Sequence, residues 1–242
     1  MNFKRVMVGS VVGAAIVASP AAFAGWTGNV GASSKYLFRD IAQNGDAAVQ
    51  GGMDYGHESG LYFGTWASNI GFGGAGGESS EVDVYAGWGA DLGGLGVDLG
   101  VLYYWYPEED EVDSDLSTVE FYGGLSFGPA SVTYYYSDET NFFIGDDNAE
   151  EGGYLSGSVE LPISDTVAIT AGVGFYDGDE IERYLASVGS DDDTYVDYSL
   201  GISKSLDGGM SFSFTIVDTD IEASGVDDDP EVVVSFAKEF EL

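Results

Sequence analysis

The chain has 242 residues, which limits it to one or two domains, and it contains no cysteine, which excludes disulfide bonds and thiolate metal sites. Seven basic residues stand against 42 acidic ones, and this balance excludes nucleic acid as a partner because a phosphate backbone requires a basic surface. With 44% hydrophobic residues and 37 glycines, the composition favours a folded chain of many short strands and turns over a disordered one.

The first 24 residues have the pattern of a cleaved secretory signal peptide. Lys4 and Arg5 precede a short apolar stretch, and Ala22 and Ala24 are the small residues of a cleavage site before Gly25. The apolar stretch is shorter than the roughly 20 residues that a membrane-spanning helix needs, so we prefer this interpretation to an N-terminal anchor. We predict a signal peptide over residues 1–24 and a mature domain over residues 25–242.

The mature domain shows a recurring alternation of apolar with small or polar residues, which is typical of β-strands. In the clearest segment, 95–105, apolar side chains occupy one face, while Gly96, Asp98 and Gly100 occupy the other. Each predicted strand is close to the roughly 9 to 11 residues that a tilted strand needs to cross a bilayer. The twelve predicted strands lie at about 27–39, 48–57, 60–70, 81–90, 95–106, 118–127, 130–137, 153–161, 167–176, 194–204, 210–217 and 231–242.

The connections between these strands alternate strictly between short and long. The short ones are 58–59, 91–94, 128–129, 162–165 and 205–209, and the long polar ones are 40–47, 71–80, 107–117, 138–152, 177–193 and 218–230. Short periplasmic turns and longer extracellular loops produce this pattern in outer-membrane barrels. A soluble β-sandwich would share the alternation within strands but has no reason to alternate its connections. We therefore predict an all-β, transmembrane, up-and-down antiparallel β-barrel of about 12 strands.

Aromatic residues gather near the ends of the predicted strands. Tyr36 and Phe38, and likewise Tyr103 and Trp105, close strands that run outward. We predict that such rings form the two interfacial girdles of a membrane barrel, although strand propensity alone also favours aromatic residues. The last strand alternates apolar residues up to Phe240, and we expect the barrel-assembly machinery to recognise this C-terminal strand.

Three sequence blocks near the start of the mature domain resemble a known family. Tyr36, Phe38 and Arg39 form a tyrosine-x-phenylalanine-arginine block, followed by VQGG-x-DY-x-HESG over 49–60 and WASN over 66–69. This segment resembles the proteobacterial TorF family of porins, whose members usually have glycine after that arginine, where this chain has Asp40. The resemblance is strongest over the first quarter of the mature chain, and it implies a β-barrel in the outer membrane of a Gram-negative bacterium.

Charged side chains on strands are expected to face the interior, because each would cost roughly 2 to 4 kcal/mol on the lipid face near the midplane. About twelve strands leave a narrow passage between the filled interior of small barrels and the open channel of large porins. The alternative is that these charges pair and fill a closed interior. The predicted pore-lining residues are Lys35, Arg39, Gln50, Asp54, Asp83, Asp98, Glu120, Glu160 and Asp197.

The leading functional prediction is a porin-like channel for passive diffusion of small hydrophilic solutes or ions, with a preference for cations. The alternative is a non-conducting structural or adhesion barrel whose acidic loops bind cations. The acidic runs at 108–111, 146–147, 191–193 and 227–229 offer carboxylates to divalent cations or to lipopolysaccharide bridged by such ions, but none has EF-hand spacing. We therefore predict no specific metal site. Expected partners are outer-membrane lipid, lipopolysaccharide, and small solutes or cations.

An enzymatic function is not predicted. His57 is the single histidine, and it lies in a predicted turn beside Glu58 and Ser59. A serine nucleophile needs a base that a third group orients at a place that substrate can reach, and outer-membrane phospholipases would place such residues on the outward-facing lipid side. We therefore expect His57 to be a structural residue of the turn. We predict no catalytic residues and no cofactor.

Overall fold

The computed structural model describes residues 24–43, 46–71, 80–107, 116–140, 142, 150–223 and 229–242. Residues 1–23, which hold nearly all of the predicted signal peptide, lie outside the described residues, as do the acidic runs at 108–111 and 146–147 and residues 227–228. Cleavage after Ala24 stays a prediction. Within the described ranges, no helix is both long enough and apolar enough to cross a membrane.

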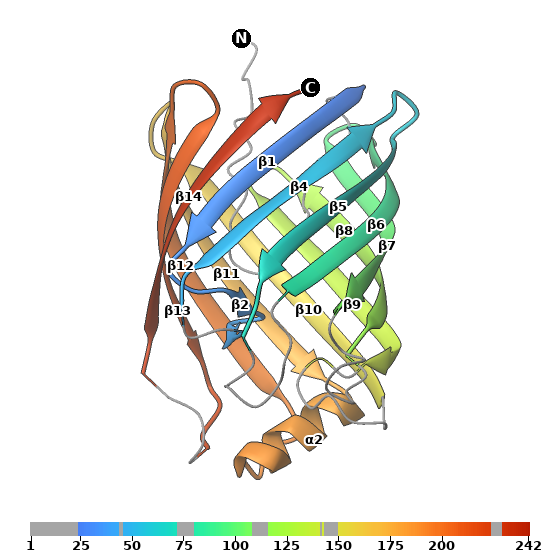
Figure 1. Cartoon of the computed structure of the whole chain (residues 1–242), viewed down its shortest axis with the longest axis vertical. Helices are drawn as coiled ribbons and strands as arrows, with labels where there is room; N and C mark the ends of the chain where they lie inside the picture. The colour runs from blue at the N-terminus through green and yellow to red at the C-terminus, as the bar shows by residue number, and fades with distance from the viewer. Residues whose placement is uncertain are drawn as a thin grey trace.

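Twelve long strands form a closed antiparallel barrel (Figure 1). Each strand pairs with its neighbours along the chain, and β1 closes the ring by pairing with β14, with Thr27 opposite Glu241. The predicted up-and-down barrel of twelve strands is confirmed. The barrel strands are β1 (Gly25–Ser33), β4 (Ala48–Gly56), β5 (Leu61–Asn69), β6 (Ser80–Asp91), β7 (Leu95–Trp105), β8 (Thr118–Phe127), β9 (Ala130–Thr140), β10 (Glu150–Pro162), β11 (Val167–Asp177), β12 (Tyr195–Leu206), β13 (Met210–Thr219) and β14 (Glu231–Glu241).

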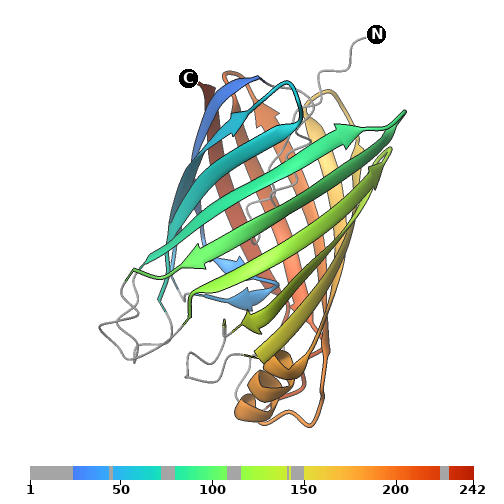
Figure 2. The same ribbon diagram turned by 90° about the vertical axis from the view of Figure 1, so that its right-hand side faces the viewer.

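The two ends of the barrel differ in their connections, as the sequence predicted. One end, here called the turn end, carries the short turns between the paired strands together with the start of β1 and the C-terminus. The backbone amide of Leu242 donates to the carbonyl oxygen of Trp26 at 3.0 Å and joins the two ends of the strand array there. The opposite end, here called the loop end, carries the longer connections and helix α2 (Asp179–Val188) (Figures 1 and 2).

The outward face of the barrel is apolar. Large hydrophobic side chains at alternate positions are exposed on every barrel strand, as with Leu200 in the middle of β12, which is 56% exposed. Soluble proteins rarely expose a continuous apolar surface of more than a few hundred Å², whereas a transmembrane barrel presents one to lipid. Trp88, Trp105, Tyr134 and Tyr136 are exposed on this face near strand ends, where an interfacial girdle would lie.

The first predicted strand is wrong at its end. It was expected to run to Arg39, but β1 ends at Ser33, and the chain then forms a small hairpin of β2 (Leu37–Phe38) and β3 (Ile41–Ala42). Figures 1 and 2 both show this short ribbon inside the barrel wall, towards the loop end. Tyr36, Leu37 and Phe38 are all buried, at 1%, 2% and 6% exposed. Three consecutive buried residues require protein on both sides, which a lipid-facing strand lacks, so Tyr36 and Phe38 do not belong to a girdle.

The predicted polar loop over 177–193 is also wrong in part, because it contains helix α2. Ile181 and Leu185 lie one helical turn apart and are fully buried against Tyr176 and Tyr195. The helix ends at Gly189, whose φ of 88° is the left-handed conformation common at helix C-termini. The helix therefore packs on the interior cluster at the loop end.

Candidate channel lumen

The hairpin inside the barrel, residues 37–42 and here called the lumen hairpin, has a two-residue turn. Phe38 pairs with Ile41, and the turn residues Arg39 and Asp40 have φ of 50° and 61°. Positive φ at both central residues is the requirement of a type I′ turn, which usually carries asparagine and glycine. Each larger residue in this conformation costs roughly 1 to 2 kcal/mol, so tertiary contacts must hold the turn. One of these contacts is the hydroxyl of Tyr195, which donates to the carbonyl oxygen of Arg39 at 2.9 Å.

The side chain of Arg39 is enclosed by aromatic rings and one carboxylate. Its guanidinium carbon lies 4.5 Å from the ring centre of Tyr154 and 4.6 Å from that of Tyr176. An Nη2 nitrogen forms an ion pair with Oε1 of Glu120, and the two side chains are 5% and 1% exposed. The group of residues around this guanidinium, here called the guanidinium cage, consists of Phe38, Tyr135, Phe142, Tyr154, Tyr176 and Glu120.

The barrel strands that carry four of the cage residues show that Arg39 lies in the interior of the barrel. Glu120, Tyr135, Tyr154 and Tyr176 come from the four consecutive strands β8 to β11. A buried side chain in contact with four adjacent strands at once must lie inside the ring that they form. The arginine at the tip of the lumen hairpin is therefore a lumen residue.

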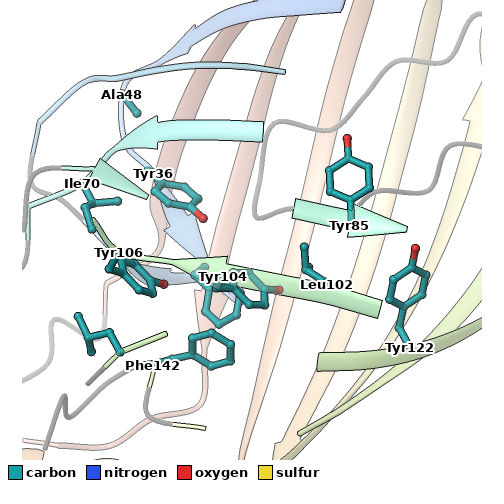
Figure 3. Packing of buried hydrophobic residues seen from close by; sticks show 11 residues of the cluster. Tyr36, Ala48, Ile70, Tyr85, Leu102, Tyr104, Tyr106, Tyr122 and Phe142 are labelled. Carbon is teal, nitrogen blue, oxygen red and sulfur yellow. The ribbon is translucent and has the colours of Figure 1, made fainter. Parts of the chain in front are cut away.

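A continuous row of tyrosines supports the cage. One inward tyrosine from each of β8 to β12 contacts the next, with ring centres 5.7 to 6.2 Å apart. Figure 3 shows the part of the interior beside this row, where Tyr104 and Phe142 lie edge to face with ring centres 4.7 Å apart. These tyrosines, here called the tyrosine ladder, are Tyr122, Tyr135, Tyr154, Tyr176 and Tyr195.

Four buried acidic residues face the interior within four positions of the loop end of their strands: Glu81, Asp83, Glu120 and Asp197. Glu81 accepts a hydrogen bond from the hydroxyl of Tyr36 at 2.6 Å, Asp197 accepts one from Tyr154 at 2.9 Å, and Glu120 accepts one from Tyr104 at 2.9 Å. Asp83 is 0% exposed, and neither of its carboxylate oxygens has a hydrogen-bond partner among the described residues. Buried negative charge is costly unless it is paired, so this cluster favours cations or protons.

Asp40 adds a further acidic group beside the cage. It lies in the connection between β1 and β4 rather than in a spanning strand. Burial, and secondarily the charge of Asp197, raise the pKa of the Asp40 carboxyl from 3.8 to about 8. Asp40 is therefore mostly protonated at neutral pH in this conformation.

The half of the interior near the turn end has a different lining. Inward positions on β11 to β13 carry small residues such as Gly172, Gly201 and Ser213, which are only partly buried. Four carboxylates lie at the third or fourth position from the turn end of their strands: Asp54, Asp98, Glu160 and Glu239. Asp98 accepts a hydrogen bond from Tyr62 at 2.7 Å, and Asp54 accepts one from Tyr85. The strand lysines, Lys204 and Lys238, stand in the outward-facing phase of their strands and contribute no charge to this lining.

Of the nine residues predicted to line a pore, the seven on barrel strands stand in the inward-facing phase, and Arg39 lies in the lumen. Gln50 is buried on β4, and Lys35 lies before the lumen hairpin with its Nζ 2.7 Å from Oε1 of Glu231. Lys35 and Arg39 were predicted to lie in the first strand, 27–39, and this placement is wrong because the strand ends at Ser33. Their role as pore lining stays a prediction.

Sequence reasoning missed several residues of the interior. Glu81 is two positions from Asp83 on the same strand, so the parity of the alternation could have found it. The same parity places all five residues of the tyrosine ladder on the inward face of their strands. Phe142 lies in a predicted loop, where no periodicity indicates its direction. Among the described residues, no three histidine, aspartate or glutamate side chains are arranged to hold a metal ion.

Comparisons with known proteins agree with this architecture. No curated protein matches the sequence. The structure of the NanC porin in a rhombohedral crystal form has a TM-score of 0.59 and 13% identity, over 90% of this chain and 100% of that chain. The KdgM porin has a TM-score of 0.55 and 7% identity, over 89% of this chain and 99% of that chain. At these identities the likeness shows the fold alone, which is that of a porin β-barrel.

A family model also matches the sequence. Its description is a bacterial protein of unknown function (Gcw_chp), and it matches residues 14–240. The resemblance to TorF porins is not tested by this match and stays a prediction. Since the match spans nearly the whole chain, the protein belongs to the Gcw_chp family of bacterial proteins of unknown function.

Proposed function

We propose that this protein is an outer-membrane channel for passive diffusion of small hydrophilic solutes, with a preference for cations. The outward apolar belt and the porin-like fold support a place in the outer membrane, in contact with lipid and lipopolysaccharide. The observation that carries the proposal is the lining of the turn-end half of the interior. The inward positions there carry small, partly accessible residues, and the carboxylates of Asp54, Asp98, Glu160 and Glu239 provide the charge of this lining.

The preference for cations follows from where the charges lie. A narrow passage lined by one sign of charge concentrates ions of the opposite sign and excludes ions of its own sign. The strand lysines face outward, and the remaining basic residues of the mature chain, Lys35, Arg39 and Arg183, lie towards the loop end, each within 4.0 Å of a carboxylate. A permeating ion therefore meets a net negative wall.

The lumen hairpin is the constriction in this proposal. Its residues from Leu37 to Arg39 are 2 to 8% exposed, so the side chains fill the loop-end half of the interior in this conformation. Conductance is therefore expected to be small with the hairpin in place and larger when it withdraws.

The charge preference is tested by single-channel recording in planar bilayers with a gradient of potassium chloride. Wild-type protein should show a reversal potential of the sign that potassium selectivity produces. The triple variant Asp54→Asn, Asp98→Asn, Glu160→Gln should bring the reversal potential closer to zero, whereas Lys204→Gln on the outward face should leave it unchanged. A reversal potential of the opposite sign in the wild type would overturn the preference for cations.

A second candidate function, a non-conducting structural barrel, is favoured by one observation, the filled loop-end half of the interior. Replacing residues 37–42 by a glycine-serine segment of equal length separates the two. An increase in conductance in this variant supports a channel narrowed by the hairpin. Absence of conductance in both proteins, with correct barrel folding shown by circular dichroism, supports the closed barrel.

A further inference from the structure

We propose that the guanidinium cage is a binding site for guanidinium-bearing solutes, and that Arg39 occupies it as an internal ligand that such solutes displace. The inference deepens the proposed channel function, on which it rests for the route by which a solute reaches the site. Its substrate class is defined by chemistry, a planar cation that can stack between aromatic rings and pair with a carboxylate.

The contacts of Arg39 are those by which proteins bind organic cations as ligands. Its guanidinium carbon lies 4.5 to 4.6 Å from the ring centres of Phe38, Tyr154 and Tyr176 and 5.7 Å from those of Tyr135 and Phe142. Cation–π attraction is strongest when the cation is removed from water, as it is here. Nη1 of Arg39 has no hydrogen-bond partner among the described residues, so the rings and Glu120 hold the group.

The part of the cage that matters for a solute belongs to the barrel wall. Tyr135, Tyr154 and Tyr176 are on β9 to β11, and continuous strand pairing fixes their backbone positions. Glu120 on β8 is held by the hydroxyl of Tyr104 as well as by Arg39. Withdrawal of the lumen hairpin would remove Arg39 and Phe38 and leave the three tyrosine rings of the wall and the Glu120 carboxylate in place. The remaining pocket would then be complementary to another guanidinium.

The lumen hairpin is suited to leave this site. Two backbone pairs, Leu37 with Ala42 and Phe38 with Ile41, and one hydrogen bond at its base, from the amide of Gln43 to the carbonyl oxygen of Tyr36 at 2.9 Å, hold it together. Its turn has two non-glycine residues at positive φ. Oδ2 of Asp40 is buried and has no partner among the described residues. A solute that repeats the contacts of Arg39 without this strained turn can therefore compete with it.

The geometry also distinguishes the guanidinium class from other cations. A guanidinium is flat, weakly hydrated and able to stack on tyrosine while it donates to a carboxylate, whereas an ammonium is a compact and strongly hydrated charge. A neutral ureido group has the same shape but lacks the charge that Glu120 pairs with. L-Arginine, L-lysine and L-citrulline therefore form a matched set of probes.

Binding is measured by isothermal titration calorimetry on the full mature chain refolded in detergent. The Arg39→Ala variant should bind L-arginine at least about tenfold more tightly than it binds L-lysine or L-citrulline. It should also bind L-arginine about tenfold more tightly than the wild-type protein does. Adding Glu120→Gln to Arg39→Ala should remove most of this affinity. Lys204→Ala, which removes a basic residue from the outward face of β12, should behave as wild type.

A second variant and a second readout keep the test decisive. If Arg39→Ala does not fold, Arg39→Gln keeps a side chain of similar length and takes its place.

In liposome-swelling assays, the rate of entry of each amino acid is compared with that of glycine, and the wild-type protein should admit L-arginine faster than L-lysine. The double variant Tyr154→Leu, Tyr176→Leu should abolish this difference. Equal binding of L-arginine and L-citrulline by the Arg39 variant overturns the inference, even if glycine enters and the channel stands. Vesicles closed to all three amino acids, with tight binding of L-arginine by the variant, overturn the channel and support the site.

Discussion

At the scale of single residues, the interior of this barrel is organised around one arginine. Arg39 neutralises Glu120, while Glu81, Asp83 and Asp197 rely on tyrosine hydroxyls or have no partner among the described residues. A buried ion pair contributes little net stability by itself, because desolvation opposes the attraction. The rings around Arg39 add favourable contacts that do not require a second charge. The pair is therefore better suited to holding the lumen hairpin in one position than to stabilising the barrel.

Asp40 makes the position of this hairpin sensitive to pH. Burial raises the pKa of Asp40 to about 8, so the protonated form favours the inserted hairpin. The free energy by which protonated Asp40 favours the inserted hairpin is fully present below the ordinary pKa of 3.8 and is lost as the pH rises through about 8. The reason is that an ionised Asp40 would face Asp197 and the ring of Tyr154. Single-channel conductance of the wild type should therefore be higher at about pH 9 than at about pH 6.

The control for this prediction is Asp40→Asn, which keeps the shape of the side chain and cannot ionise. Its conductance should change much less between the two pH values than that of the wild type. The same rise in both proteins would show that another group controls the hairpin.

At the scale of elements, helix α2 acts with the lumen hairpin to close the loop end. Ile181 and Leu185 pack on Tyr176 and Tyr195, and Tyr195 in turn donates to the carbonyl oxygen of Arg39. Arg183 attaches the helix to the start of β10 through Glu150, with Nη1 and Oε2 3.1 Å apart. The helix thus supports the same tyrosines that surround the hairpin. Loosening either element is expected to loosen the other.

The docking of α2 can be tested with Leu185→Ala. Removing a fully buried leucine side chain typically costs about 2 to 5 kcal/mol, which here would fall on the docking of the helix rather than on the strands. Limited proteolysis with trypsin after Arg183 should therefore be much faster than in the wild type. Ala186→Ser, an exposed position on the same helix, should leave the cleavage rate near that of the wild type. Equal rates in all three proteins would contradict the packing described here.

At the scale of the whole molecule, the barrel reverses the usual distribution of side chains. Apolar residues cover its outer face, while glycine, serine, tyrosine and carboxylates line its interior. The closed ring pairs every barrel strand on both sides and leaves no open sheet edge, which is the condition for a sheet to exist in hydrocarbon. The strong excess of acidic residues is compatible with this design, because those on the barrel strands face the lumen or lie towards strand ends.

The orientation of the wall is tested by comparing adjacent positions of β12. Leu200 faces outward at mid-strand, so Leu200→Arg should lower the free energy of unfolding by about 2 to 4 kcal/mol in phospholipid vesicles. Ser199→Arg points into the lumen, where water can solvate the charge, and should cause a smaller loss. Denaturant titrations monitored by tryptophan fluorescence measure both. An equal or greater loss for Ser199→Arg would mean that the assignment of faces is wrong.

The sequence by itself determined the class of fold and the direction of most strand side chains. Alternation with a period of two depends only on neighbouring residues, so segments such as β7 and β12 could be located and oriented without tertiary information. The same holds for the alternation of short and long connections. The alternation also contained the inward tyrosines, although their mutual contacts across five strands could not be derived from it.

The tertiary structure alone decided where the chain from Ser34 to Gln43 goes. Its path depends on Glu120 and Tyr195, which are 81 and 156 residues away from Arg39 in the chain and have no signature in the local sequence. Tyr36 to Arg39 continue a pattern that a strand would also satisfy, and only the closed barrel supplies the rings that make burial of Arg39 favourable. Helix α2 is an intermediate case. The spacing of Ile181 and Leu185 was present in the sequence, but its meaning required the apolar cluster on which the helix packs.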